Sequence, residues 1–168
     1  KWIEEDKTTA LVDTLENAGS SLGDISDAVA KFETQGVEEE DLPFAVQKAL
    51  RVSMLRRLLT DQPTFIDVAK NVIDVRDFYD LLRRVIYPER SHGKLGGKSS
   101  GMFLASQAVK KSLKDTPIFA NIKIPRSWYL SSDCLRLFIH HNNLEEVYDR
   151  KYTEIEKVRQ GYPHLIQV

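Results

Sequence analysis

The residues whose types and spacing best fit a chemical task lie in the glycine-rich stretch 93–101. Four of the chain's eight glycines fall there, namely Gly93, Gly96, Gly97 and Gly101. Glycines this dense let backbone N–H groups turn toward an anion without interference from a Cβ atom. Lys98 follows Gly97 directly and adds a positive charge. A glycine-rich turn that leads into a helix N-terminus predicts a phosphate-binding site.

The charges around this stretch also favour an anionic ligand. Between residues 90 and 123 the chain has seven Lys and Arg residues and one acid, Asp115. A surplus of positive charge raises the local concentration of phosphate groups. The residues predicted to bind nucleotide are Gly96, Gly97, Lys98 and Ser99. The alternative interpretation is a linker between two modules, in which the glycines provide flexibility alone.

The Walker A pattern does not fit this stretch. That pattern requires a glycine five residues before the glycine of its Gly-Lys pair. Here His92 occupies the required position, and Gly93 comes one residue too late. A Walker A turn also follows a buried strand, whereas residues 81–87 are predicted to end a helix. The sequence therefore argues against a P-loop.

Three other groups of polar residues are interpreted as structural. The acids at 38–41 suit a helix N-terminus, where the helix dipole stabilises negative charge. His140 and His141 are adjacent, so they point in different directions on a helix, whereas paired metal ligands need a spacing near four. Cys134 fits a small apolar residue at the start of a helix. We therefore predict no catalytic residue and no metal site in this chain.

The elements that must position the glycine turn begin with an acidic helical bundle. The predicted helices are one that contains Leu11, Val12 and Leu15 and ends near Gly19, one that carries Leu22, Ile25, Val29 and Phe32 and ends at Gly36, one over residues 39–59, and one over residues 64–86. Each has apolar residues at spacings of three and four. Ser21 and Asp24 resemble a capping box, and Pro43 falls in the first turn of the third helix. Asp80 and Arg84 are expected to pair across one turn.

The second half predicts a smaller α/β piece. Its expected elements are a helix after the glycine turn with Phe103, Leu104, Ala108 and Leu113 on its apolar face, β-like segments at 118–125 and 128–130, a helix capped by Ser131, Ser132 and Asp133, and a last helix over about 144–160. The predicted fold class is therefore mainly α, with an N-terminal helical bundle followed by a small α/β piece.

Length and charge bound the organisation of the chain. Its 168 residues, 42% of them hydrophobic, are enough for a domain with a proper core. Residues 1–89 hold 11 Lys and Arg against 18 Asp and Glu, and residues 90–168 hold 13 against 7. This asymmetry predicts two modules, an acidic bundle at 1–89 and a basic segment at 90–168. Because the chain starts at Lys1 and stops within an apolar stretch, we interpret it as a fragment.

The expected location is the cytoplasm. The single cysteine, Cys134, argues against a disulfide framework and against a cysteine-based zinc cage. No apolar run reaches the roughly 20 residues that cross a bilayer, and no secretory leader opens the sequence. A membrane is therefore not an expected partner.

The glycine turn and a second motif together resemble a known nucleotide-binding domain. The residues concerned are Gly96-Gly97-Lys98-Ser99-Ser100-Gly101, then a helix, then Ile124-Pro125 and Trp128-Tyr129-Leu130-Ser131-Ser132-Asp133. This order is similar to the start of the ATP-grasp domain in the phosphoenolpyruvate synthase and pyruvate phosphate dikinase family. The resemblance covers about residues 94–168, and Trp128 departs from the glycine that the family commonly has after the proline.

The resemblance implies roles for the residues of the glycine turn. Gly96 and Gly97 would supply the tight backbone, and Lys98 would approach the phosphates of ATP, which binds with Mg²⁺. Phosphoryl transfer depends mainly on positioning and on charge neutralisation, so a fixed lysine beside backbone donors suits it. The family completes its site with arginines and metal-binding acids that are expected beyond Val168. His92 lacks the context of the family's phosphocarrier histidine and is not assigned that role.

The resemblance also implies a function. The expected function is that of the N-terminal fragment of an ATP-dependent phosphotransferase that acts through phosphoenolpyruvate and pyruvate, with the fragment inactive alone. Its partners would be the nucleotide and the remaining domains of the same protein.

A different class of function stays open beside it. The chain would then be a non-catalytic interaction module whose basic half contacts nucleic acid or another anionic surface. Nucleic acid is not the expected partner, because the aromatic residues of this half fit core positions better than a stacking platform. These residues are Phe103, Phe119, Trp128 and Tyr129.

Overall fold

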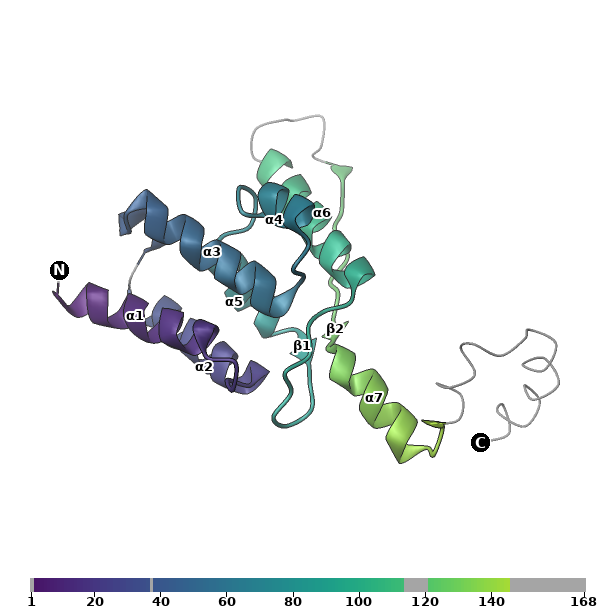
Figure 1. Ribbon diagram of the computed structural model, residues 1–168. Helices are drawn as coiled ribbons and strands as arrows, with labels where there is room; N and C mark the ends of the chain where they lie inside the picture. Colours follow the sequence, from purple (N-terminus) through teal and green to yellow (C-terminus); the bar gives the residue numbers. More distant parts are fainter. Residues whose placement is uncertain (1, 37, 114–120, 146–168) are drawn as a thin grey trace. The chain divides into compact units, whose positions relative to one another are not determined.

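The fold is mainly helical, as the apolar spacing predicts. The computed structural model describes residues 2–36, 38–113 and 121–145 (Figure 1). The elements in chain order are α1 (Trp2–Glu16), α2 (Leu22–Thr34), the 3-10 helix η1 (Glu39–Asp41), α3 (Phe44–Leu58), α4 (Pro63–Ala69), α5 (Val75–Leu82), β1 (Val85–Ile86), α6 (Gly97–Leu113), β2 (Tyr129–Leu130) and α7 (Ser132–His141). The chain divides into two compact units, Lys1–Cys134 and Leu135–Val168.

Helix α2 forms as predicted, because its start signal and its apolar face agree. Ser21 and Asp24 make the expected capping box, in which each side chain accepts a hydrogen bond from the other residue's backbone N–H. All four apolar residues of the predicted face are buried. Gly36, just after the helix, has a φ of 69°, a left-handed conformation that glycine adopts without strain.

The third predicted helix begins later than expected. Residues 39–41 form η1, and α3 starts only at Phe44. Pro43 therefore precedes the helix instead of lying in its first turn. Leu42 is extended, with φ −80° and ψ 149°, because a residue before proline avoids the helical region. The prediction of one helix over residues 39–59 was wrong for this reason.

The fourth predicted helix is in fact two helices and a strand. Asp74 is extended, and its side chain forms a capping box with Asp77, which starts α5 afresh after α4. Helix α5 ends at Leu82, and Val85–Ile86 is a strand, so the expected helix through residue 86 was wrong. Nε of Arg84 donates to the backbone carbonyl of Asp80 at 3.0 Å and not to its carboxylate.

Strands β1 and β2 form a two-stranded parallel sheet joined by α6. Val85 pairs with Tyr129, and Ile86 pairs with Leu130. Parallel strands need a long crossover, and α6 provides it here. The predicted strand at 128–130 is thus confirmed at Tyr129–Leu130. For the other predicted β-like segment, residues 121–125 are not a strand, and 118–120 lie outside the described residues.

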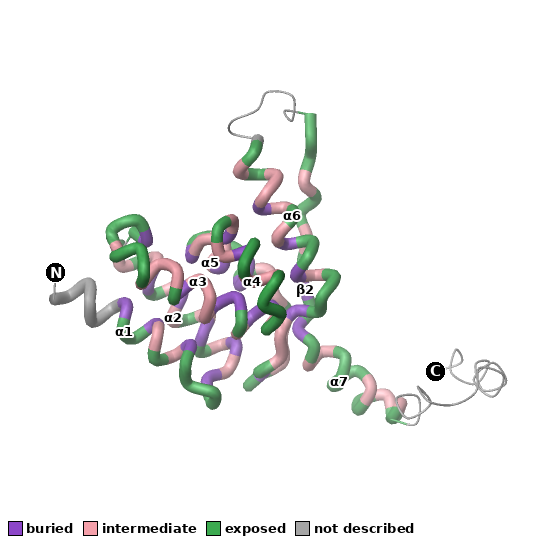
Figure 2. Tube along the Cα trace, turned by 45° about the horizontal axis from the view of Figure 1, so that its top comes forward, coloured by how far each residue is buried: buried purple, intermediate pink, exposed green. Residues whose placement is uncertain are grey.

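One core joins the acidic helices to α6 and β2 within the first unit. The Phe103 ring of α6 lies between two others, 6.2 Å from Phe78 of α5 and 6.4 Å from Tyr129 of β2 by ring centroids. Buried residues run through α1, α2, α3 and α5 as well, as the purple segments of Figure 2 show. This unit therefore contains the helices of the acidic half together with the first part of the basic segment. The division into two modules at residues 89/90, which was based on charge, stays a prediction.

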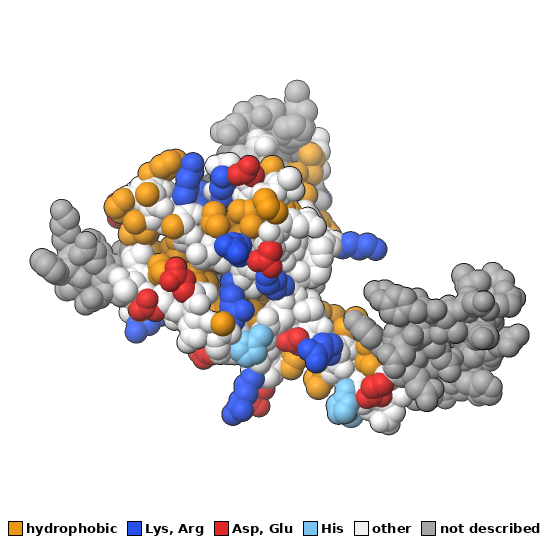
Figure 3. Space-filling model, in the orientation of Figure 1, with side chains coloured by type: hydrophobic (Ala, Val, Ile, Leu, Met, Phe, Trp, Pro, Cys, Tyr) orange, Lys and Arg blue, Asp and Glu red, His pale blue; other side chains and the backbone are white. Residues whose placement is uncertain are grey.

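The surface of the first unit mixes charges of both signs. Figure 3 shows Lys and Arg side chains interspersed with Asp and Glu, and hydrophobic side chains over α3 and α4. Phe44 of α3 and Val68 of α4 are exposed hydrophobic residues, at 69% and 58%. Of the helices described, none is both long enough and apolar enough to cross a membrane.

The second unit is described only to residue 145. Nδ1 of His140 lies 2.9 Å from a carboxylate oxygen of Glu145, and both histidines fall in the last turn of α7. The apolar residues Leu135, Leu137 and Phe138 are all more than half exposed. Most of the predicted helix over 144–160 lies outside the described residues.

Candidate phosphate-binding site

The predicted anion-binding turn lies at the start of α6. Gly97 is the first residue of this 17-residue helix. The N–H of Ser100 donates to the carbonyl of Gly96 at 2.9 Å, which is the first i to i−4 hydrogen bond at this end of the helix. The N–H groups of residues 97–99 precede that bond and have no carbonyl acceptor within the helix. Such groups at the positive end of a helix dipole attract anions. The structure therefore brings the four predicted residues, Gly96, Gly97, Lys98 and Ser99, together in one turn.

This turn is open on its outer side. A Cβ atom placed on Gly96 or on Gly97 would have no atom within 4 Å, so neither glycine is required by the packing around it. Lys98 is exposed, and it forms no ion pair with any described residue. A ligand could therefore approach the N–H groups and the ammonium group without displacing a side chain.

The loop just before the turn already holds an anion, which is the carboxylate of Asp133. Its Oδ2 accepts hydrogen bonds from the Ser91 hydroxyl at 2.9 Å, from the His92 N–H at 2.9 Å and from the Gly93 N–H at 2.7 Å. Asp133 therefore binds a loop 40 residues away, in addition to standing in the first turn of α7, where it was predicted to cap the helix. The N–H of Gly93 serves this internal carboxylate.

Residue 93 must be glycine because the start of α7 packs closely against it. A Cβ atom at residue 93 would lie 2.6 Å from Oγ of Ser132 and 2.9 Å from Cγ of Asp133. Of the four glycines in the stretch, only this one meets close neighbours. The sequence grouped all four as one anion-binding loop, whereas the structure gives Gly93 a packing role and leaves Gly96 and Gly97 open.

The segment that carries the turn is anchored at several points. The carbonyl of Ser91 accepts from the N–H of Leu22 at 2.7 Å, and the N–H of Leu95 donates to Leu58 at 2.9 Å. Lys94 pairs with Asp61, and this hydrogen bond lowers the pKa of the Asp61 carboxyl. Contacts to two different helices argue against the interpretation of this stretch as a free linker.

His92 and Cys134 take structural contacts rather than chemical roles. The Nδ1 of His92 lies 3.0 Å from the carbonyl of Ser20 and donates a hydrogen bond to it. The Cys134 thiol donates to the carbonyl of Ile86 at 3.3 Å. Both residues thus help to hold neighbouring segments together.

The acidic cluster contains a buried carboxylate that the sequence did not single out. Glu39 is 8% exposed and pairs with Arg51. Its second oxygen accepts the N–H of Val75, the first residue of α5, at 2.7 Å. A carboxylate does stabilise a helix N-terminus here, but the helix is α5 and not the one that follows in sequence. Nothing in the sequence near Glu39 indicates that it binds the start of α5; only the tertiary contact identifies that helix as its partner.

A second group of polar residues that the sequence missed is cationic. Arg84, Lys110, Lys123 and Arg126 surround one hollow beside α6. Two of them belong to the surplus of Lys and Arg between residues 90 and 123, which was assigned to the glycine turn alone. The excess of positive charge in the sequence was thus the available signal for this group. The β1-α6-β2 crossover determines that these four side chains come together at one hollow.

Comparison with known proteins adds no relative to this picture. No protein-family model, no curated protein and no solved structure matches the chain.

Proposed function

We propose that this chain supplies a phosphate-binding part of the ATP site in a phosphotransferase that resembles the phosphoenolpyruvate synthase and pyruvate phosphate dikinase family. The observation that carries the proposal is the open turn at the start of α6. It combines N–H groups at a helix N-terminus, two glycines with free space around them and an exposed Lys98 that pairs with no carboxylate of the described part of the chain. This combination suits the phosphates of a nucleotide.

The position of the turn in the fold supports a ligand site. In parallel β-α-β units, ligands bind outside the carboxyl ends of the strands, where the crossover helix begins. Here β1 leads through the loop to α6, and α6 returns to the parallel strand β2. The open turn is therefore at the end of the unit where nucleotide phosphates bind in other α/β proteins.

The described residues do not fit a magnesium site held by protein side chains. The turn itself contains no carboxylate, and among the residues described there is no group of three or more His, Cys, Asp or Glu able to hold a metal ion. Magnesium often binds through the phosphates of its nucleotide. In this proposal the chain's own residues bind and orient the phosphates, and no step runs through the metal.

The alternative of a nucleic-acid-binding module receives partial support from the aromatic residues. Phe103 and Tyr129 are buried in the core, as expected, so they cannot stack on bases. Trp128 is 57% exposed, which corrects the expectation that it belongs to the core, and Phe119 lies outside the described residues. Among the described residues of this half, two aromatic side chains are exposed, Trp128 and Phe138, which are few for a stacking platform.

The proposal is tested by titrating the 168-residue chain with Mg-ATP in a calorimeter. Lys98→Ala is expected to weaken binding at least about tenfold, because it removes a charge-assisted contact to phosphate. Gly97→Ala is expected to do the same with no loss of stability, because its methyl group fits the free protein but occupies the ligand's space. Lys31→Ala and Gly101→Ala are matched controls at exposed positions outside the turn.

Two results would contradict the proposal. Equal affinities for Lys98→Ala and Lys31→Ala would show that the turn does not bind the phosphates. Salt-sensitive binding of an oligonucleotide, unchanged by Lys98→Ala, would favour the interaction module instead. We expect no ATP turnover by this chain, and measurable hydrolysis would also contradict the assignment of a binding role alone.

A further inference from the structure

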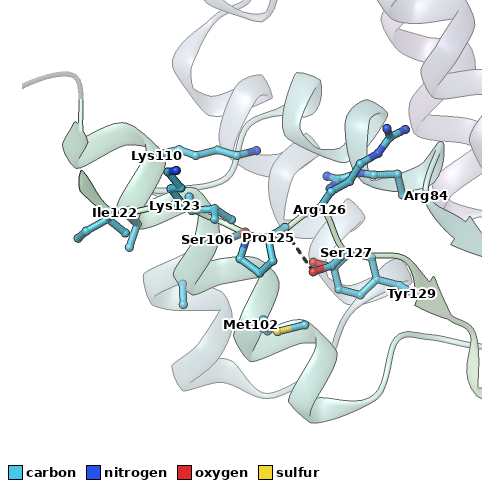
Figure 4. Close-up of a pocket in the computed structure, with 13 residues that line it drawn as sticks. Arg84, Met102, Ser106, Lys110, Ile122, Lys123, Pro125, Arg126, Ser127 and Tyr129 are labelled. Carbon is cyan, nitrogen blue, oxygen red and sulfur yellow. Dashed lines mark hydrogen bonds between the residues drawn. The ribbon is translucent and has the colours of Figure 1, made fainter. Parts of the chain in front are cut away.

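A hollow of about 380 Å³ lies between α6 and the segment 122–129. Figure 4 shows its lining, in which Lys110 and Lys123 lie at one side and Arg84 and Arg126 at the other, with Pro125 between them. All of these residues belong to the first compact unit. Lys98 does not line the hollow, so it is separate from the turn at the start of α6.

The four cations around the hollow have no carboxylate partner among the residues that the structure describes. No Asp or Glu lines the hollow. Several other basic side chains of the unit are paired with carboxylates: Lys111 with Asp74, Lys94 with Asp61 and Arg51 with Glu39. Four like charges gathered without a counter-charge repel one another, and an anion among them would remove that cost.

The rest of the lining is mainly apolar. Met102 and Val109 contribute from α6, and Ile124 and Pro125 contribute from the facing segment. Ser106 and Ser127 add two hydroxyl groups. An inorganic anion alone would leave this apolar surface in contact with water, whereas a ligand with a ring or a hydrocarbon body would cover it.

We propose that this hollow binds a small organic phosphate, with the phosphate group among the four cations and the apolar body against Met102, Ile124 and Pro125. The planar guanidinium groups of Arg84 and Arg126 suit two oxygens of one phosphate. The volume lies at the lower end of the range for small-molecule sites. A concave site of this size favours a small molecule over a nucleic acid strand. This inference does not rest on the proposed function, since it involves another site.

The test uses 1-naphthyl phosphate as the probe, with inorganic phosphate and 1-naphthol as its two halves. Binding to the 168-residue chain is measured by calorimetry, and the site is located from NMR shifts of the Ile124 and Met102 methyl groups. The double variant Lys123→Gln/Arg126→Gln removes half of the charge at two exposed positions. It is expected to weaken binding at least about tenfold, while Lys31→Ala, at an exposed position outside both sites, leaves it unchanged.

Each half of the ligand has its own expected result. Ile124→Asn should weaken the binding of 1-naphthyl phosphate and leave that of inorganic phosphate as it was. Failure of 1-naphthyl phosphate to bind more tightly than inorganic phosphate would overturn the proposal. An affinity that the double variant does not change would overturn it too. Tighter binding of a twelve-nucleotide strand, lost in the double variant, would replace it with a nucleic-acid contact. Because Lys98 is not in the hollow, failure here leaves the ATP proposal standing, and the reverse also holds.

Discussion

Gly93→Ala should destabilise the first unit even though the added group is one methyl. The new Cβ atom would lie 2.6 Å from Oγ of Ser132, 2.9 Å from Cγ of Asp133 and 3.0 Å from the backbone nitrogen of Asp133. The Ser132 hydroxyl is a rotatable side chain and can turn away. The Asp133 atoms cannot move without cost, because the carboxylate accepts three hydrogen bonds at 2.7 to 2.9 Å.

The magnitude follows from those three hydrogen bonds. The φ of Gly93 is not positive, so the substitution adds no backbone strain of the left-handed kind, and the cost is one of contact. To restore ordinary contact, Asp133 must withdraw by several tenths of an ångström, which weakens all three bonds together. Hydrogen bonds to a charged group contribute about 1.5–3 kcal/mol each. Partial loss of three predicts a decrease of about 2–4 kcal/mol in the free energy of unfolding.

The assay is urea unfolding followed by circular dichroism, with Gly101→Ala as the matched control. A Cβ atom on Gly101 meets nothing within 4 Å, and alanine is favoured over glycine inside a helix by about 1 kcal/mol, so this variant should be slightly more stable. Combining Gly93→Ala with Asp133→Asn should cost less than the sum of the two changes, because both act on one contact. A Gly93→Ala protein within about 0.5 kcal/mol of the parent would refute the reasoning.

Three further changes test the packing of the same unit. Lys111→Met removes the cation that lies 2.7 Å from Asp74 and 3.0 Å from Asp77, and thermal unfolding should show a loss of about 1–3 kcal/mol, discounted because the site is partly exposed. Glu39→Ala removes a buried carboxylate that pairs with a cation and accepts the first N–H of α5, so a loss of about 3 kcal/mol is expected in urea; no loss would show that the pair is not buried in solution. Burial raises the pKa of Glu33, so at a pH above that pKa the charged carboxylate lowers the stability of the folded state. Glu33→Gln should therefore increase the free energy of unfolding at pH 7 and leave it unchanged below the pKa of the unfolded state. A gain in stability that does not depend on pH would exclude this cause.

Local signals were enough to predict α2 and the position of the glycine turn. In α2 the capping residues, the apolar spacing and the terminal glycine all lie within the helix or next to it, and no distant contact opposes them. The start of α6 at Gly97 is also signalled locally, by the glycines and by the apolar residues at helical spacing that follow them. Such elements can be read from the sequence because their determinants are near neighbours in it.

Periodicity failed where a helix break preserved the apolar spacing. Val72 and Val75 are three apart and continue the stripe of α4 into that of α5, although a turn separates the two helices. The break depends on Asp74, whose capping box with Asp77 starts α5. The two-residue strand β1 was hidden for another reason, because it pairs with residues more than 40 positions later. A pairing over that distance leaves no pattern in either segment.

The position of the candidate site at the start of a helix could be predicted from the sequence, but which N–H groups of the loop are free for a ligand could not. The contacts of Asp133 explain the difference. Two segments of the glycine-rich loop present backbone N–H groups, residues 91–93 and residues 96–99. Nothing in the sequence indicates which of the two binds an internal carboxylate. The parallel pairing of β1 with β2 brings the start of α7 beside the first of these segments, where the Asp133 carboxylate satisfies its N–H groups. The second segment receives no such carboxylate from the described residues. The internal anion therefore fixes the loop from which α6 begins, and the N–H groups of Gly97, Lys98 and Ser99 are the donors to which the proposal assigns a phosphate.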